Sequence, residues 1–526
     1  IALRDVLWAI RHDRLRTAIE VGALAGRDAS VGAVAGYLAI QRALSAIDRL
    51  EVRGRDSAGI NVIVHHHALD LDDPAVRAAI DARDDDPMYT SGSVRHVDGV
   101  LSFAYKAAAE IGELGDNTRV LRAAVAGDDL LRRSLAADDA RTSVLGHTRW
   151  ASVGIISEPN THPLNSDELE TSPSMLQPPY VVAALNGDVD NHADLRVAHQ
   201  LRIHPQVTTD AKVIPTLIAR HAGSGADLVE AFRRTVSAFE GSVAIGAMCA
   251  SDPDNMLLAL NGSGQGLYVG LADDCYVVAS EPYGVVEETH RYLRLDGEHG
   301  GEIVVLDGAA AGTVEGIRRL AYDGAPLPVG GDEIVTAEVT TRDIDRGDAP
   351  HFLLKEIGEA PNSFRKTLRS KIVDRDGVLA ASIGDRALPP DVAARLANGT
   401  ITRIRVIGQG TAAVAGRSAA ALLDELCDGH LDVDAITATE LSGFQLRLDT
   451  SDTLAAVRKR ASDDVERVYL KEQLSSNEGR INATARAAGI TERQLHKLMV
   501  KHGLKKEDYR KPRAARSSRR TSKRSA

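Results

Sequence analysis

Apolar side chains recur at helical spacing through the opening part of the chain. Leu7 and Ile10 belong to such a pattern in residues 3–20, and a second amphipathic stretch covers residues 31–50. We therefore expect residues 1–50 to form a helical segment.

Short apolar runs separated by Gly, Asp and Asn replace this spacing farther along the chain. They predict strands at residues 242–248, 256–260, 266–269, 276–279 and 303–306. Strands spaced in this way indicate the layered core of a β-sandwich. By contrast, the acidic stretch at about 71–140 is expected to be rich in helix, with residues 103–112 forming its packed helix.

The composition is that of an ordinary soluble protein, with 44% apolar and 26% charged residues among 526. No apolar run reaches the roughly 18 residues of a membrane helix, so we expect a cytoplasmic protein without membrane contact. Cys249, Cys275 and Cys427 show no paired spacing. A disulfide framework and a zinc site are therefore not expected. We also expect no other metal site and no cofactor.

The stretch from Val144 to Asn165 carries the first candidate chemistry. A short apolar run delivers Arg149 and Trp150 into a segment interrupted by Gly154. A planar guanidinium held in this way can bind both oxygens of a carboxylate. The alternative is a surface arginine beside a buried tryptophan.

Several motifs stand in a fixed order around this stretch: Arg53-Gly-Arg-Asp-Ser-Ala-Gly59, His147-Thr-Arg-Trp-Ala151, Asn160 with His162-Pro163, Asn186-Gly187, and Asp210 with Val213-Ile214. In this order they resemble the class II glutamine amidotransferase domain, and in detail the glutaminase half of the glucosamine-6-phosphate synthase family. The resemblance implies an α+β, N-terminal-nucleophile-type αββα sandwich over residues 51–325, with residues 71–140 as a helical insertion.

The resemblance also implies how glutamine is bound. Arg149 would hold the α-carboxylate with help from the Ser152 hydroxyl, where the family often has Thr. Asp210 would accept the α-ammonium, which suits an ionised carboxylate. Val153 stands where the synthase often has His, so control of this loop is expected to differ.

The same resemblance assigns the chemical step. The Asn186 side-chain amide and the Gly187 backbone N–H would form the oxyanion hole. Trp150 would cover the site and gate ammonia, and Arg53 would support the end that carries the nucleophile. In the family that nucleophile is a cysteine at the mature N-terminus, whereas residue 1 here is Ile and all three cysteines follow the Arg53 motif. Either the true beginning is missing from the printed chain, which we favour, or the glutaminase is inactive.

A second resemblance to the synthase follows a linker at residues 326–395. A predicted buried strand at 401–407, a glycine turn and a predicted helix at 412–426 look like the opening βα unit of a sugar isomerase (SIS-like) domain over residues 396–460. Thr411 would then face fructose-6-phosphate, although Ala412 replaces the expected Ser. The Ser-Gln-Ser-Gly loop that grips the sugar phosphate does not follow.

The C-terminal part has a different character. In residues 461–510, Asn482 and Thr491 are placed to cap two short helices around a glycine turn. The sequence resembles the all-α, Fis-type helix-turn-helix of NtrC-like activators. Its outward side chains, which would contact DNA, are Thr491, Arg493, Gln494 and Lys497.

The chain then ends in a basic segment. Residues 511–526 carry Lys and Arg with no acid, which predicts a disordered tail attracted to phosphate. A plain three-helix packing unit is the alternative to DNA binding.

Three hypotheses follow from these patterns. The first is a glutamine-dependent amidotransferase that resembles glucosamine-6-phosphate synthase, hydrolyses glutamine for amination of fructose-6-phosphate, and is incomplete as printed. The second is a homodimeric DNA-binding regulator that uses a degenerate amidotransferase fold as a sensor. The third is an artefactual join of two reading frames near residues 453–462.

Overall fold

The computed structural model describes most of the chain, with interruptions. The described residues are 2–52, 54–108, 113–150, 154–169, 179–262, 264–298, 300–369, 371–375, 377–382, 384, 387–408, 410–427, 429–438, 467, 469–471, 473–475, 477, 479–488, 492–502 and 504–509. They divide into two compact units, Ile1–Gly358 and Glu359–Ala526. Among these residues, every helix is too short or too polar to cross a bilayer.

The chain begins with the helices that the apolar spacing predicted. The first stretch consists of α1 (Ala2–Trp8), a π-helical turn (Ala9–Arg14) and α2 (Leu15–Ala25), and the second is α3 (Val31–Leu50). The Ser30 side chain accepts a hydrogen bond from the Ala33 N–H at 3.0 Å and so caps α3. The expected helical segment is confirmed.

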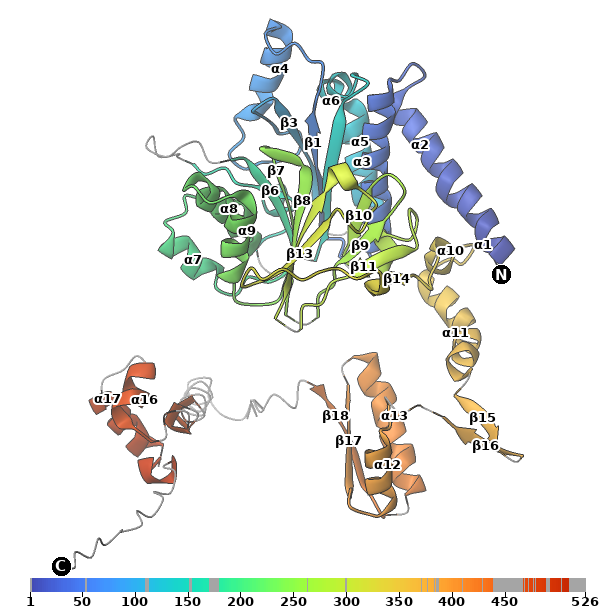
Figure 1. Ribbon diagram of the computed structural model, residues 1–526, viewed down its shortest axis with the longest axis vertical. Helices are drawn as coiled ribbons and strands as arrows, with labels where there is room; N and C mark the ends of the chain where they lie inside the picture. Colours follow the sequence, from blue (N-terminus) through green and yellow to red (C-terminus); the bar gives the residue numbers. More distant parts are fainter. Residues whose placement is uncertain are drawn as a thin grey trace, which may run out of the picture. The chain divides into compact units, whose positions relative to one another are not determined.

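Sheet A is an antiparallel sheet with the strand order β2-β3-β1-β4. Its strands are β1 (Ser57–His65), β2 (Val94–Val97), β3 (Val100–Ala108) and β4 (Arg141–Arg149). Helix α3 packs on its outer face together with α5 (Asp116–Gly127), as Figure 1 shows. Two further helices, α4 (Pro74–Asp84) and α6 (Asp129–Ser134), complete this part of the chain.

The expected helix at residues 103–112 is wrong, because residues 100–108 form strand β3. Both faces of this strand are covered, so its residues from Val100 to Ala107 are all buried and no polar alternation marks the strand. Residues 71–140 accordingly supply two strands of sheet A as well as helices.

Sheet B is a six-stranded sheet with the order β13-β12-β8-β7-β6-β5. Its strands are β5 (Leu164–Asn165), β6 (Val181–Gly187), β7 (Val243–Cys249), β8 (Asp252–Asn261), β12 (Glu302–Asp307) and β13 (Ile317–Ala321). Sheet C has the order β10-β9-β11-β14. Its strands are β9 (Tyr268–Leu271), β10 (Tyr276–Ala279), β11 (Arg291–Arg294) and β14 (Ile334–Thr336). The five strands predicted from residues 242–306 are confirmed.

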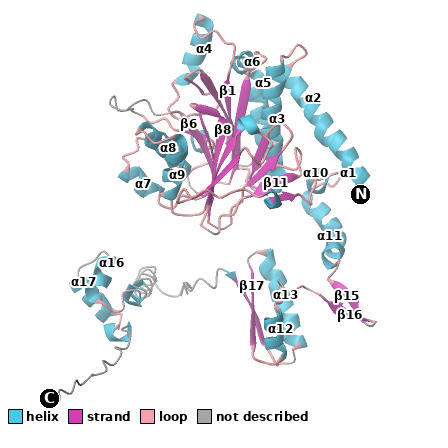
Figure 2. Cartoon of the chain, in the orientation of Figure 1, coloured by secondary structure: helices cyan, strands magenta, loops and turns pink. Residues whose placement is uncertain are grey.

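Alternate residues of sheet B face opposite layers. Val181 and Leu185 pack toward α8 (Val213–Gly223) and α9 (Leu228–Ser237), whereas Val182 packs with side chains of sheet A. The order of layers is therefore helix, sheet, sheet, helix, and Figure 2 shows the strands between the two helical layers. This is the αββα arrangement that we expected.

Sheet C packs on the same inner face of sheet B. Leu258 and Val304 of sheet B form one apolar cluster with Val269 and Leu293 of sheet C. Sheets A and C therefore both lie against one side of sheet B.

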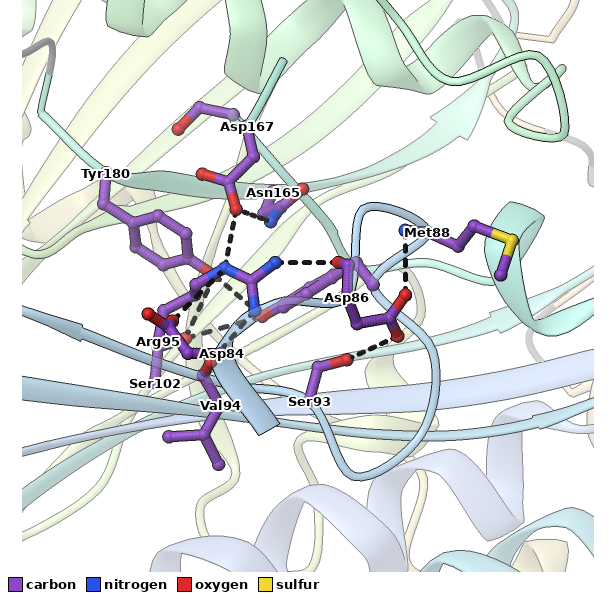
Figure 3. A network of polar contacts seen from close by, with 12 residues as sticks. Asp84, Asp86, Met88, Ser93, Val94, Arg95, Ser102, Asn165, Asp167 and Tyr180 are labelled. Atoms are coloured by element: carbon purple, nitrogen blue, oxygen red, sulfur yellow. Dashed lines mark hydrogen bonds and ion pairs between the residues drawn. The ribbon is translucent and has the colours of Figure 1, made fainter. Parts of the chain in front are cut away.

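A buried polar network joins sheet A to the loop that follows β5 (Figure 3). Arg95 on β2 donates its Nε–H to Asp167 Oδ2 at 2.7 Å, and the Asn165 amide donates to the same oxygen at 2.7 Å. Lys212 Nζ donates to the Asn165 carbonyl at 2.6 Å. Through Lys212, the network fixes the end of the short 3-10 turn at Asp210–Lys212.

The second unit contains small separate elements. After α11 (Phe352–Leu368), which crosses the division, these are a hairpin of β15 (Ile372–Arg375) and β16 (Val378–Ala381), then α12 (Pro390–Ala397), and a parallel unit of β17 (Arg403–Gly408), α13 (Thr411–Leu426) and β18 (Asp432–Thr437). The expected strand–turn–helix is present. However, β17 alternates between exposed and half-exposed residues and is not the buried strand that we expected, because β18 is its only neighbour in the described sheet.

The last described α-helices are α16 (Ile481–Ala487) and α17 (Glu492–Lys501), and a 3-10 turn at Lys506–Tyr509 follows them. Ala485 of α16 and Leu495 and Met499 of α17 form one apolar cluster. Leu470 and Leu474, which precede α16 in the chain, belong to the same cluster.

Two glycines of the opening helices differ in their surroundings and offer a test of the packing. A Cβ at Gly32 on α3 would lie 1.9 Å from the Ala137 carbonyl oxygen, whereas a Cβ at Gly22 on α2 would meet nothing within 4 Å. We expect Gly32→Ala to lower the free energy of unfolding of this unit by about 1–3 kcal/mol. Gly22→Ala is the matched control and should leave it unchanged or raise it by about 0.5–1 kcal/mol. Scanning calorimetry measures both, and equal transitions would contradict the close approach of α3 to Ala137.

Candidate functional site

A cavity of about 1040 Å³ runs between sheets A and C. Its lining includes every residue from 140 to 150 along β4 and every residue from 274 to 281 along β10. Successive residues of a strand point to opposite faces, so a cavity that touches all of them follows the edge of the strand. Within the described residues, β4 lies at one edge of sheet A and β10 at one edge of sheet C.

The other two walls of the cavity are also identified by their residues. Small side chains of α3 line one wall, among them Ala35, Ala39 and Ala43. Ala184 and Ala244 of sheet B line the opposite wall. The cavity is thus a slot with a strand edge on each side and mainly small apolar side chains above and below.

The predicted site residues of the first unit meet at this slot. Arg149, Trp150, Asn186, Gly187 and Asp210 all line it, although they come from β4, β6 and the turn after residue 209. Arg53 and Ser152 lie outside the described residues.

Arg149 is the last residue of β4 and is only 4% exposed. Burial lowers the pKa of its guanidinium, and the nearby carboxylates of Asp210 and Asp56 oppose this shift. The backbone leaves no room beside it, since a Cβ at Gly54 would lie 2.6 Å from the Trp150 nitrogen. The early Gly54 of the Arg53 motif therefore allows the chain to pass directly behind Arg149.

Asp210 is the anionic counterpart and is 4% exposed. Its Oδ2 accepts a hydrogen bond from the Val189 N–H at 2.8 Å, and its Oδ1 accepts one from the Thr209 hydroxyl at 3.2 Å. Burial raises the pKa of this carboxyl, while these hydrogen bonds act in the opposite direction. The result is a buried carboxylate in a fixed orientation.

Asn186 and Gly187 end strand β6. Gly187 has φ of 120°, and a Cβ at this position would lie 2.0 Å from the Ser242 carbonyl oxygen. Only glycine fits this backbone, since the φ value and the available space both exclude a side chain. The turn that follows is held by the Asp188 N–H, which donates to the same Ser242 oxygen at 3.0 Å.

Asn160 belongs to the ordered motifs of the sequence, which did not indicate its function. The structure shows that its side chain holds a loop. Its side-chain oxygen accepts hydrogen bonds from the Thr208 and Thr209 N–H groups at 2.7 and 2.9 Å, and its amide donates to the Gln206 carbonyl at 3.0 Å. Asn160 is fully buried. It clamps the loop that presents Asp210, a role that the linear order of residues did not reveal.

Two histidines of the recognised motifs also line the slot. The rings of His147 and His162 are 4.7 Å apart between centroids. Desolvation, reinforced by Arg149, lowers the pKa of His147 to about 4, and burial holds the pKa of His162 well below its ordinary value. Both imidazoles are therefore neutral at pH 7.

The cysteines of the first unit differ in their access to the slot. Cys249 is buried on β7, where burial raises its pKa. Cys275 lines the slot with its Sγ 3.3 Å from an Arg42 guanidinium nitrogen, yet burial raises its pKa to about 12. Neither thiol is activated as a nucleophile at neutral pH.

Trp150 lines the slot but is largely exposed, and the other predicted residues belong to the second unit. Trp150 is 76% exposed, and its predicted role as a cover of the site stays a prediction. Thr411 is the first residue of α13, and Lys497 is exposed on α17. Thr491 and the side chains of Arg493 and Gln494 lie outside the described residues.

No protein-family model matches the chain. Among curated proteins, it is 31% identical over 246 residues to the glutamine–fructose-6-phosphate aminotransferase (isomerizing) of Bacillus cereus strain ATCC 10987, which covers 47% of this chain and 37% of the relative. The enzyme of the same name from Streptococcus pneumoniae serotype 4 is 26% identical over 404 residues, 77% of this chain and 53% of the relative.

Solved structures give a weaker comparison. The glutamine phosphoribosylpyrophosphate amidotransferase of B. subtilis, complexed with ADP and GMP, has 22% identity and a TM-score of 0.34, and the match covers 54% of this chain and 46% of that one. Since the chain spans about half or less of the curated relatives, similarity to them concerns only part of each. Over that part, the chain is similar to glutamine-dependent amidotransferases of the glutamine–fructose-6-phosphate aminotransferase type.

Proposed function

We propose that the first unit binds glutamine and is the glutaminase part of an amidotransferase that resembles glucosamine-6-phosphate synthase. One observation carries the proposal: a buried arginine, a buried aspartate and the Asn186-Gly187 strand end line the same cavity. The similarity to glutamine–fructose-6-phosphate aminotransferases supports it.

A free amino acid is a zwitterion, and the proposed site offers one partner for each charge. Arg149 binds the α-carboxylate through its planar guanidinium, and Asp210 accepts the α-ammonium. Burial disfavours the charged form of both side chains, as the directions of their pKa shifts indicate. A bound zwitterion compensates the two charges locally, which favours ligands that carry both.

The Asn186 side-chain amide and the Gly187 N–H are the proposed oxyanion hole. A donor that is fixed before the reaction stabilises the negative charge that develops on the amide oxygen, and losing one such donor costs about 10²–10³ in rate. Gly187 is held against the Ser242 carbonyl, so its peptide has little freedom to reorient. This rigidity is what an oxyanion hole requires.

The nucleophile of the proposed reaction is a cysteine carried on an extended strand. The slot supports this proposal, because its two long walls are strand edges and an added strand could hydrogen-bond to β4 and β10 together. Such a strand would end beside Arg149 and Asn186. Its thiolate attacks the glutamine amide carbon, ammonia leaves with a proton, and water then hydrolyses the thioester to glutamate.

Amination of fructose-6-phosphate is the proposed use of that ammonia. The parallel unit β17–α13–β18 supports a sugar isomerase element, with Thr411 at the start of its helix as the proposed sugar contact. An oxygen or phosphate group at this end would meet the positive end of the helix dipole.

Binding of double-stranded DNA by the C-terminal helices is the second candidate function. Its support is the cluster that packs α16 and α17 together, with Lys497 exposed on α17. Residues 511–526 would add sequence-independent attraction to phosphate. A regulator that senses glutamine would combine both candidate functions in one homodimeric chain.

The glutamine proposal predicts that binding depends on Arg149. We expect Arg149→Ala to weaken glutamine binding to the full chain by about 100-fold, measured by isothermal titration calorimetry, because the carboxylate loses a charged partner in a buried site. Arg141→Ala at the other, exposed end of β4 is the matched control and should bind like the parent chain. Equal affinities of Arg149→Ala and Arg141→Ala would overturn the assignment.

The slot predicts that an added strand with a cysteine at its start supports hydrolysis of glutamine. A strand segment beginning with Cys is joined ahead of residue 1 through a flexible Gly/Ser linker, and a second chain carries Ser in place of that Cys. We expect the chain with Cys to release ammonia from glutamine and the chain with Ser to release none. Adding Arg149→Ala to the chain with Cys should abolish the release. Full glutamine binding without ammonia release from the Cys chain would contradict the proposed path of the nucleophile.

DNA binding predicts an effect of Lys497 beyond that of the basic tail. In a chain ending at residue 510, Lys497→Ala should weaken duplex binding and reduce the slope of log affinity against log salt by about 1. Lys471→Ala, at another exposed position of this unit, serves as the control. Identical salt slopes for both variants and the parent chain would show that Lys497 of α17 does not contact DNA.

A further inference from the structure

His162 lies between the two halves of the proposed glutamine site and is 3% exposed. Its Nδ1 is 3.4 Å from the Leu185 nitrogen and 3.2 Å from the Leu185 carbonyl oxygen. Its Nε2 is 3.3 Å from the Thr209 hydroxyl oxygen. Both ring nitrogens therefore contact protein groups, one on the oxyanion strand and one on the loop of Asp210.

The donors and acceptors along this path select one tautomer. The Thr209 hydroxyl has one hydrogen and donates it to Asp210 Oδ1 at 3.2 Å. The hydroxyl oxygen must then accept from His162, which places the imidazole proton on Nε2. Nδ1 is left as an acceptor, and its donor is the Leu185 N–H.

These bonds form a closed path around the oxyanion residues. It runs from Leu185 through His162, Thr209 and Asp210, whose second oxygen accepts from the Val189 N–H at 2.8 Å. Leu185 and Val189 flank Asn186-Gly187 on the same chain segment. The ring of hydrogen bonds thus holds the proposed ammonium acceptor and the proposed oxyanion hole as one rigid unit.

We propose that His162, as the neutral Nε2–H tautomer, is a positioning residue that fixes Asp210 relative to the Asn186-Gly187 strand end. It acts through Leu185 and Thr209, and its significance for glutamine rests on the proposed function above. The Thr209 hydroxyl and the Val189 N–H each donate to one oxygen of Asp210, and together they set the orientation of its carboxylate. Ammonium binding and stabilisation of the oxyanion then share one framework.

Thr209 offers the cleanest test, because valine matches its shape without the hydroxyl and serine keeps the hydroxyl. We expect Thr209→Val to weaken glutamine binding to the full chain by about tenfold, since a hydrogen bond to a charged group is lost. Thr209→Ser should bind glutamine like the parent chain. Calorimetric titration measures the affinities, and thermal melting checks that each variant is folded.

A spectroscopic measurement tests the path without any ligand. The ¹⁵N shifts of selectively labelled histidine, assigned with a His162→Gln variant, should show Nε2–H in the parent and Thr209→Ser chains. In Thr209→Val the proton should move toward Nδ1, which lies 3.2 Å from the Leu185 carbonyl oxygen.

The outcomes separate the two proposals. If the parent chain binds no glutamine, the proposed function fails. The histidine shifts then still show whether the ring of hydrogen bonds through His162 exists. If the parent chain binds glutamine and a folded Thr209→Val binds it equally well, the positioning role is overturned. Identical histidine shifts in Thr209→Val and the parent would overturn the ring itself.

Discussion

The inner face of sheet B packs against two sheets at once, and the rest of the first unit depends on this constraint. Its apolar side chains divide between sheet A and sheet C, so the edges of β4 and β10 face a common slot. The helix α3 closes the slot with small side chains, which keeps the space open along the strand edges. A site at one end of this slot is therefore bounded by strand edges, by α3 and by sheet B.

Charge in this site is costly, and the surrounding backbone compensates for it. Arg149 and Asp210 are both almost completely buried, where an isolated charge would be strongly disfavoured. Asp210 receives hydrogen bonds from Val189 and Thr209, and Asn160 holds the loop that carries it. Fixed dipoles thus hold the Asp210 carboxylate in one orientation inside the buried site.

Much of the fold followed from local patterns. Helical spacing of apolar residues predicted α3, and short apolar runs bounded by Gly, Asp and Asn predicted five strands of sheets B and C. The pattern misled at β3, where both faces are buried and alanines near its end imitate a helix. Periodicity distinguishes a strand from a helix only when one face meets water.

The sequence by itself determined which residues are chemically suited to the site. Arg149, Asn186, Gly187 and Asp210 stood out by type and order, and the structure brings them to one cavity. The tertiary structure alone decided how they are held. The clamp of Asn160, the ring through His162 and the slot between β4 and β10 depend on hydrogen bonds and packing between segments far apart in the chain. Such distances and directions are set by the packing of whole sheets, which no local run of residues encodes.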